Sequence, residues 1–240
     1  MVKYIALVPF VCLACFTGYT QDSAATDLVK TAENNAIHYY NQFIDKQSRL
    51  YNGIDHLGYN PKIKGHAYFE VNEMRNGSLI YDGLHFNNVP MQYDLLKDQL
   101  VILHFNKLMK MALVNQKIKE FTINDHHYIR LVKDSANNQP LETGYYDEVY
   151  KGKTAVLVHR TKFIQETVTD RLEQEFIEKN SYYIKKGGSF KTVKTYKGLL
   201  GMFGDKARDV RRYLKKNRIK YRKDKEMAIS KAAAYYDTLN

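Results

Sequence analysis

The chain of 240 residues is poor in cysteine, with only Cys12 and Cys15 near its start. If the chain is cut near Gln21, the remaining protein has no thiol. That excludes disulfides, cysteine nucleophiles and thiolate metal sites after the cut. Tryptophan is absent too, whereas 20 tyrosines and 11 phenylalanines give the composition of a folded, β-rich protein.

Long hydrophobic runs are also missing. After Lys3, an uncharged stretch from Tyr4 to Phe16 is followed by small and polar residues from Thr17 to Asp22. The stretch is shorter than the roughly 20 apolar residues of a membrane-spanning helix. A charged start, a short apolar middle and a polar exit are typical of a secretory signal. We therefore predict that residues 1–21 are a signal peptide and that the protein is exported.

Two alternatives to a cleaved signal remain open. The segment could be a buried N-terminal strand of a cytosolic protein. Cys15 could instead carry the lipid of a lipoprotein, since Leu13 and Ala14 precede it. Against lipidation, Cys12 stands where leucine is usual and Phe16 is a bulky follower. Soluble export is therefore favoured, to the periplasm or to an association with the outer membrane.

Acidic residues are scarce at the other end of the chain. Residues 181–240 hold 17 lysines and arginines against 5 aspartates and glutamates, a balance of +12. The whole chain carries +11, so residues 1–180 together carry −1. The basicity thus belongs to the C-terminal quarter alone.

Apolar spacing predicts an α+β fold in three parts. Residues 1–21 are the signal. Residues 22–195 form an N-terminal helix, Asp27 to Gln47, packed on a curved antiparallel β-meander from Ser48 to Lys194. Residues 196–240 form a basic helical segment packed on that sheet.

Turn residues support this meander. Asp82-Gly83 and Gly187-Gly188 each separate two short apolar runs and predict hairpin turns, because their central positions tolerate positive φ. Residues 163–179 fit either a helix or two strands, and the flanking strands favour two strands. In the C-terminal segment, Asp205 and Asp224 each precede an apolar stripe and are predicted helix N-caps.

Enzyme motifs are largely absent. No nucleophile elbow, phosphate loop or dinucleotide fingerprint occurs in the sequence. Asp125-His126-His127 is the densest cluster, but neighbouring strand residues face opposite ways, so the two imidazoles would not share a metal. The sequence therefore predicts no metal, cofactor or catalytic residue. A hydrolase site remains the alternative, if the fold brings together two of His85, His104, His126, His127, Asp94 and Asp98.

The basic cluster near the C-terminus is the strongest chemical signal. Its nine cations are interleaved with Tyr213 and Tyr221, a pattern that favours polyanions. In an exported protein the partners would be lipid head groups, lipopolysaccharide or acidic glycan, and nucleic acid is disfavoured. A solvated helix face is the competing interpretation. The candidate binding residues are Arg208, Arg211, Arg212, Lys215, Lys216, Arg218, Lys220, Arg222 and Lys223.

Several runs resemble a group of exported Gram-negative proteins to which no activity is assigned. The similarity lies in Leu50–Gly53, Gly65–Phe69, Gly77–Gly83 and Asn88–Asp94, and in the basic tail that ends at Asp237. The resemblance covers most of the chain after the signal. It implies export and one co-folded unit, and it transfers no catalytic residue.

These observations predict an exported cell-envelope protein that binds an anionic or amphiphilic envelope component without catalysis. The alternative is a hydrolase that acts on an envelope polymer with a histidine–carboxylate site.

Overall fold

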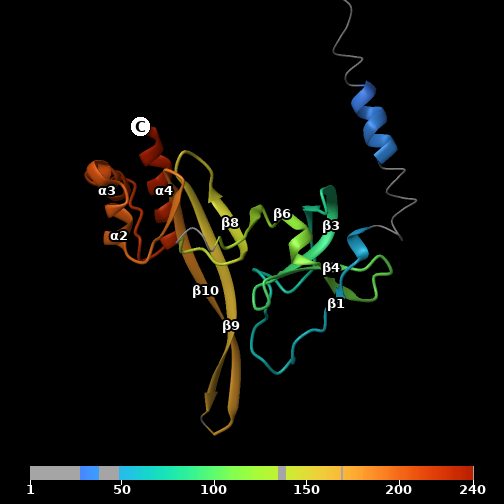
Figure 1. Ribbon diagram of the computed structural model, residues 1–240. Helices are drawn as coiled ribbons and strands as arrows, with labels where there is room; N and C mark the ends of the chain where they lie inside the picture. Colours follow the sequence, from blue (N-terminus) through green and yellow to red (C-terminus); the bar gives the residue numbers. More distant parts are fainter. Residues whose placement is uncertain (1–27, 38–48, 135–138, 169, 240) are drawn as a thin grey trace, which may run out of the picture. The chain divides into compact units, whose positions relative to one another are not determined.

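The computed structural model describes residues 28–37, 49–134, 139–168 and 170–239 (Figure 1). The chain divides into two compact units, Met1–Asp45 and Lys46–Asn240. In the first unit, residues 28–37 form a helix in which every residue is exposed. This confirms part of the predicted helix. The rest of that helix and the predicted signal peptide lie outside the described residues, and packing of the helix on the sheet stays a prediction.

The second unit is built on one open, curved, antiparallel sheet of 11 strands in the order β1-β5-β4-β3-β2-β6-β7-β8-β9-β10-β11. From β6 to β11, strands that follow each other in the chain also pair in the sheet, so the predicted meander is confirmed there. Strand β6 returns to pair with β2, which joins the two halves of the sheet. The strands are β1 (Ile54–Asp55), β2 (Arg75–Tyr81), β3 (Leu84–Asp94), β4 (Gln99–Leu103), β5 (Lys110–Ala112), β6 (Ile118–Ile123), β7 (His126–Leu131), β8 (Gly144–Tyr150), β9 (Ala155–Val168), β10 (Leu172–Lys186) and β11 (Ser189–Thr192).

The turns follow the residue types that predicted them. Asp82 and Gly83 adopt φ values of 52° and 79° between β2 and β3, and Gly187 and Gly188 adopt 57° and 81° between β10 and β11. Both hairpins are confirmed. The ambiguous residues 163–179 belong to the long antiparallel pair β9–β10, so the choice of two strands is also confirmed.

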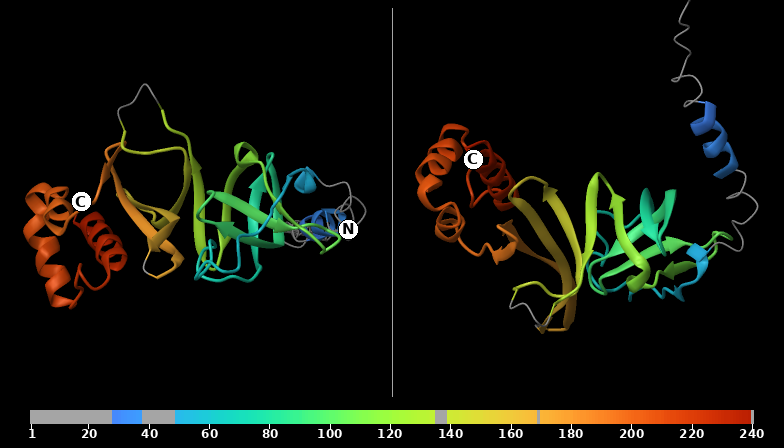
Figure 2. Two further views of the ribbon diagram at one scale, coloured as in Figure 1. Left: turned by 90° about the horizontal axis from the view of Figure 1, so that it is seen from below. Right: turned by 45° about the horizontal axis from the view of Figure 1, so that its top comes forward.

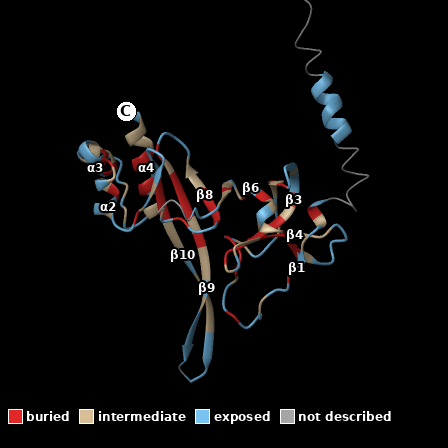
Figure 3. Ribbon diagram, in the orientation of Figure 1, coloured by how far each residue is buried: buried red, intermediate tan, exposed pale blue. Residues whose placement is uncertain are grey.

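Two large apolar clusters stabilise this unit (Figure 3). The first lies on strands β2 to β8 and centres on stacked and edge-on rings such as Tyr93, Phe121 and Tyr128. The second joins Val156, Val158 and other residues of β9 and β10 to the C-terminal helices. Burial of this second cluster holds the basic segment against the sheet.

Three helices make up the C-terminal segment and lie together beside β9 and β10 (Figure 2). Asp224 caps the last one as predicted, since its side chain accepts a hydrogen bond from Met227 N at 2.8 Å. The prediction that Asp205 caps a helix is wrong. Asp205 lies inside a short 3-10 turn, and Lys206 occupies the N-cap position of α3 without a side-chain hydrogen bond. None of the described helices is long and apolar enough to cross a bilayer. The helical elements are η2 (Arg49–Tyr51), η3 (Asn115–Lys117), α2 (Tyr196–Gly201), η4 (Gly204–Lys206), α3 (Ala207–Lys216) and α4 (Lys225–Thr238).

Candidate anion-binding groove

The end of α3 determines where the basic residues point. Ile219 N donates to Leu214 O at 2.9 Å, and Arg218 N donates to Lys215 O at 3.1 Å. Arg218 adopts a φ of 57°. These two bonds and the left-handed residue form a Schellman motif, which reverses the chain and sets Ile219 against Leu214. The chain from Arg218 onward therefore runs back beside α3.

This reversal creates an open groove of about 1260 Å³ between the start of α2, the end of α3 and the turn before α4. Eight of its lining residues are lysine or arginine and none is acidic. Six of the eight belong to the predicted cluster: Arg211, Lys215, Arg218, Lys220, Arg222 and Lys223. The other two are Lys194, just before the N-cap of α2, and Lys197, in its first turn. We call these eight residues and their pocket the basic groove.

The cations of the basic groove are exposed and are not neutralised by acids. All eight are exposed, and none forms an ion pair with an acidic residue of the described chain. Clustered like charges repel each other and concentrate counterions at the surface. An anion that enters the groove would therefore meet several unpaired cations at once.

The floor of the basic groove is apolar and aromatic. Tyr196, Leu214, Ile219 and Tyr221 line it, and the same four residues pack into the cluster that joins the helices to the sheet. The rings of Tyr196 and Tyr221 lie 5.5 Å apart between centroids. The groove thus combines a cationic rim with an apolar base.

Three predicted cations, Arg208, Arg212 and Lys216, do not line the basic groove. They recur every four residues along α3 and are exposed. Arg212 also forms an ion pair with Asp209 at 3.6 Å. The structure therefore separates the predicted cluster into six residues of the groove and three residues of a neighbouring helix face.

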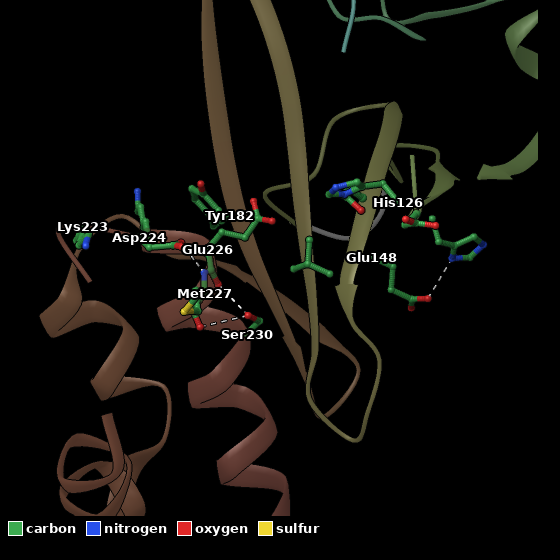
Figure 4. Close-up of a pocket in the computed structure, with 13 residues that line it drawn as sticks. His126, Glu148, Tyr182, Lys223, Asp224, Glu226, Met227 and Ser230 are labelled. Atoms are coloured by element: carbon green, nitrogen blue, oxygen red, sulfur yellow. Dashed lines mark hydrogen bonds and ion pairs between the residues drawn. The ribbon is translucent and has the colours of Figure 1, made fainter. Parts of the chain in front are cut away.

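A second cavity of about 750 Å³, the polar cleft, lies where β7 and β8 face the start of α4 (Figure 4). His126 Nδ1 lies 2.6 Å from Asp147 Oδ2, and Asp147 is buried. Hydrogen bonding to the Asp147 carboxylate raises the pKa of His126 above its usual value. Arg160 donates to Asp147 and also to Glu226 Oε1 at 3.0 Å, which connects the sheet to α4.

His127 does not join this pair. Its Nδ1 lies 3.4 Å from Glu148 Oε2, which lies on the opposite face of the sheet from Asp147. His126 and His127 therefore lie on opposite faces of the sheet, as the sequence predicted for neighbouring strand residues. In the described part of the chain, no group of three or more histidine, cysteine or acidic residues is placed to hold a metal ion.

The residues named for a hydrolase site have separate partners. Asp94 accepts a hydrogen bond from Tyr59, and Asp98 accepts one from Tyr93, both at 2.6 Å. His85 is exposed on β3, and His104, directly after β4, lies edge-on to Tyr51 and tilted against Phe105. No two of the six named residues are joined by a hydrogen bond or ion pair in the structure. His126 instead pairs with Asp147, which is 21 residues away in the sequence and outside the predicted set.

Comparison of this chain with protein-family models, with curated proteins and with solved structures found no match.

Proposed function

We propose that this protein is an exported cell-envelope component that binds an anionic or amphiphilic partner through the basic groove. The observation that carries the proposal is the set of eight exposed groove cations with no acidic neighbour among the lining residues. Lipid head groups, lipopolysaccharide phosphates and acidic glycans are the anions that such a surface meets outside the cytoplasm. Each cation near an anionic surface contributes about 1 kcal/mol at ordinary salt.

Salt dependence tests this proposal. The purified protein should be retained on immobilised heparin and on vesicles that contain anionic lipid, and retention should weaken as salt rises, because the attraction is screened. Charge reversal at Arg211 and Lys215, which both line the groove, should lower the salt needed for elution. Reversal of Lys62 and Lys119, exposed residues far from the groove in the sequence and absent from its lining, provides a control for net charge. Absence of retention, or retention that ignores salt, would contradict the proposal.

The second candidate function is hydrolysis of an envelope polymer in the polar cleft. It is favoured by the His126–Asp147 pair, since a carboxylate-oriented histidine is the usual general base. Ser230 lines the same cleft, but its hydroxyl donates to Glu226 O and is committed to the helix backbone. Water would then be the nucleophile. Degradation of envelope polymers that disappears in His126→Ala would support this candidate, and inactivity of the wild-type protein would remove it.

A further inference from the structure

The apolar floor of the basic groove distinguishes it from a plain cationic surface. A polyanion such as heparin needs only the rim, because its charges lie along its whole length. Tyr196, Ile219 and Tyr221 are each half-buried and present part of their surface to the groove. Covering apolar surface with another apolar group removes it from water, which lowers the free energy.

From this combination we infer that the basic groove binds single molecules of an anionic amphiphile. The head group, a phosphate or carboxylate, lies among the cations, and the apolar chain lies on the floor formed by Tyr196, Leu214, Ile219 and Tyr221. This inference rests on the proposed function and narrows it from a charged surface to a ligand class. The groove, at about 1260 Å³, is large enough for a ligand of lipid-like size, since small-molecule pockets measure roughly 300–1,000 Å³.

The arrangement of charges indicates where the head group would lie. Arg211 and Lys215 are one turn apart on the same side of α3, and Arg218 follows them at the reversal of the chain. Arg218 through Lys223 then return beside the same face. Cations from both sides therefore converge on the groove, whereas Arg208 and Lys216 lie outside it.

A chain-length series provides the first test. Hexyl, octyl and decyl phosphate are titrated into the whole protein below their micelle concentrations, with inorganic phosphate and octyl glucoside as head-only and neutral-chain probes. We expect saturable binding that strengthens with chain length, by up to about fourfold for each buried methylene. Inorganic phosphate should bind far more weakly, and octyl glucoside should not bind. Equal binding of the three alkyl phosphates, or no saturable binding, would overturn the inference.

Two double variants with the same change of net charge provide the second test. Arg211→Glu/Lys215→Glu changes the groove, and Arg208→Glu/Lys216→Glu changes the neighbouring face of the same helix. We expect the groove variant to lose at least tenfold in affinity for decyl phosphate and the control variant to stay within about twofold. Equal losses would overturn the inference. Heparin retention of the wild-type protein tests the proposed function separately, so failure of the groove and failure of anion binding can be distinguished.

The floor is tested at Tyr221. Its hydroxyl is buried and has no hydrogen-bond partner in the described structure, so Tyr221→Phe should leave binding unchanged. In Tyr221→Ser, the affinity for alkyl phosphates should rise less with chain length than in the wild-type protein. The weak binding of inorganic phosphate should be kept. Circular dichroism establishes that each variant is folded. If Tyr221→Ser is folded and keeps the full chain-length gain, the apolar chain does not lie on this floor.

Discussion

Arg218 combines a strained backbone with a position in the basic groove. Its φ of 57° lies in the left-handed region, which glycine adopts freely and other residues adopt at a cost of roughly 1 kcal/mol. The two hydrogen bonds of the Schellman motif hold it there. A glycine would end α3 more favourably but would remove one cation from the groove. Compared with glycine, arginine at this position lowers the stability of the helix end and adds one positive charge to the groove.

Replacement of Arg218 by glycine should separate these two effects. We expect Arg218→Gly to raise the free energy of unfolding by up to about 1 kcal/mol and to lower the salt at which the protein leaves heparin. Urea denaturation and heparin elution measure the two quantities. Arg218→Ala is the control, because it removes the same charge without relieving the backbone. Equal stability of the glycine and alanine variants would show that the left-handed position stores no strain.

The His126–Asp147 pair makes stability depend on pH. The pKa of His126 is raised by its hydrogen bond to Asp147, while Arg160 opposes this and Glu70, with Oε1 at 3.7 Å from His126 Nε2, supports it. A raised pKa means that the folded state holds the proton more tightly than the unfolded state does. The contribution to stability is therefore complete below the ordinary histidine pKa of about 6.5 and is lost as pH rises through the raised value.

Comparison of the wild-type protein with His126→Gln isolates this effect from other histidines. His56 is buried and His159 is half-buried; desolvation lowers the pKa of both, so they act in the opposite direction. We expect the difference in unfolding free energy between the two proteins to be larger near pH 5.5 than near pH 8.5, because only the wild type can charge at this position. Urea denaturation across this range measures it. A constant difference would mean that His126 does not titrate in this window.

At the level of elements, two aspartates with similar sequence surroundings behave differently. Asp224 precedes α4 in an extended conformation, and its carboxylate accepts the Met227 N–H. Asp205 lies within the turn η4, which continues directly into α3. Gly204, at a φ of 55°, allows the chain to enter that turn. An aspartate before an apolar stripe predicts a cap, but the sequence does not show that another turn precedes the helix.

Alanine substitution at both positions measures this difference. Asp224→Ala should lower the free energy of unfolding by about 1 kcal/mol, because the first turn of α4 loses its side-chain acceptor. Asp205→Ala should change it by less than about 0.5 kcal/mol, as an exposed residue without a capping bond. Thermal or urea denaturation of the two variants gives the comparison. Equal losses would mean that the side chain of Asp205 also stabilises its helix.

The strands and hairpins could be predicted because their signals are local. Asp82-Gly83 and Gly187-Gly188 are residue types that tolerate positive φ, and the strands that flank residues 163–179 favoured two strands there. The groove could be predicted only in part. Six of its cations are close in sequence, but Lys194 and Lys197 reach it through packing of α2 against α3, which no local pattern encodes. The four-residue spacing of Arg208, Arg212 and Lys216 indicates that they share one face of the helix, and this face lies outside the groove.

For the whole molecule, the two apolar clusters lie entirely within Lys46–Asn240. The second cluster takes four of its twelve buried residues from strands β9 and β10 and most of the others from the C-terminal segment: Val156, Val158, Tyr182 and Ile184 meet Leu199, Phe203, Val210 and Ile229. Neither side can bury its apolar surface without the other. The basic helices are therefore part of the fold of this unit, and the charge that they carry is held on a rigid support.

Truncation tests this dependence. A chain of residues 46–240 should unfold in one cooperative urea transition, because it contains both clusters. A chain of residues 46–195 should lose cooperativity or aggregate, since removal of the helices exposes the strand half of the second cluster, and each large apolar side chain loses about 1.5–3 kcal/mol of burial. Urea denaturation followed by circular dichroism gives both results, and residues 22–240 provide the reference for any contribution of the helix at residues 28–37. A shortened chain 46–195 that unfolds cooperatively at the same urea concentration would mean that the sheet is stable alone and that the basic helices are an appendage, in which case groove variants would change binding without any effect on stability.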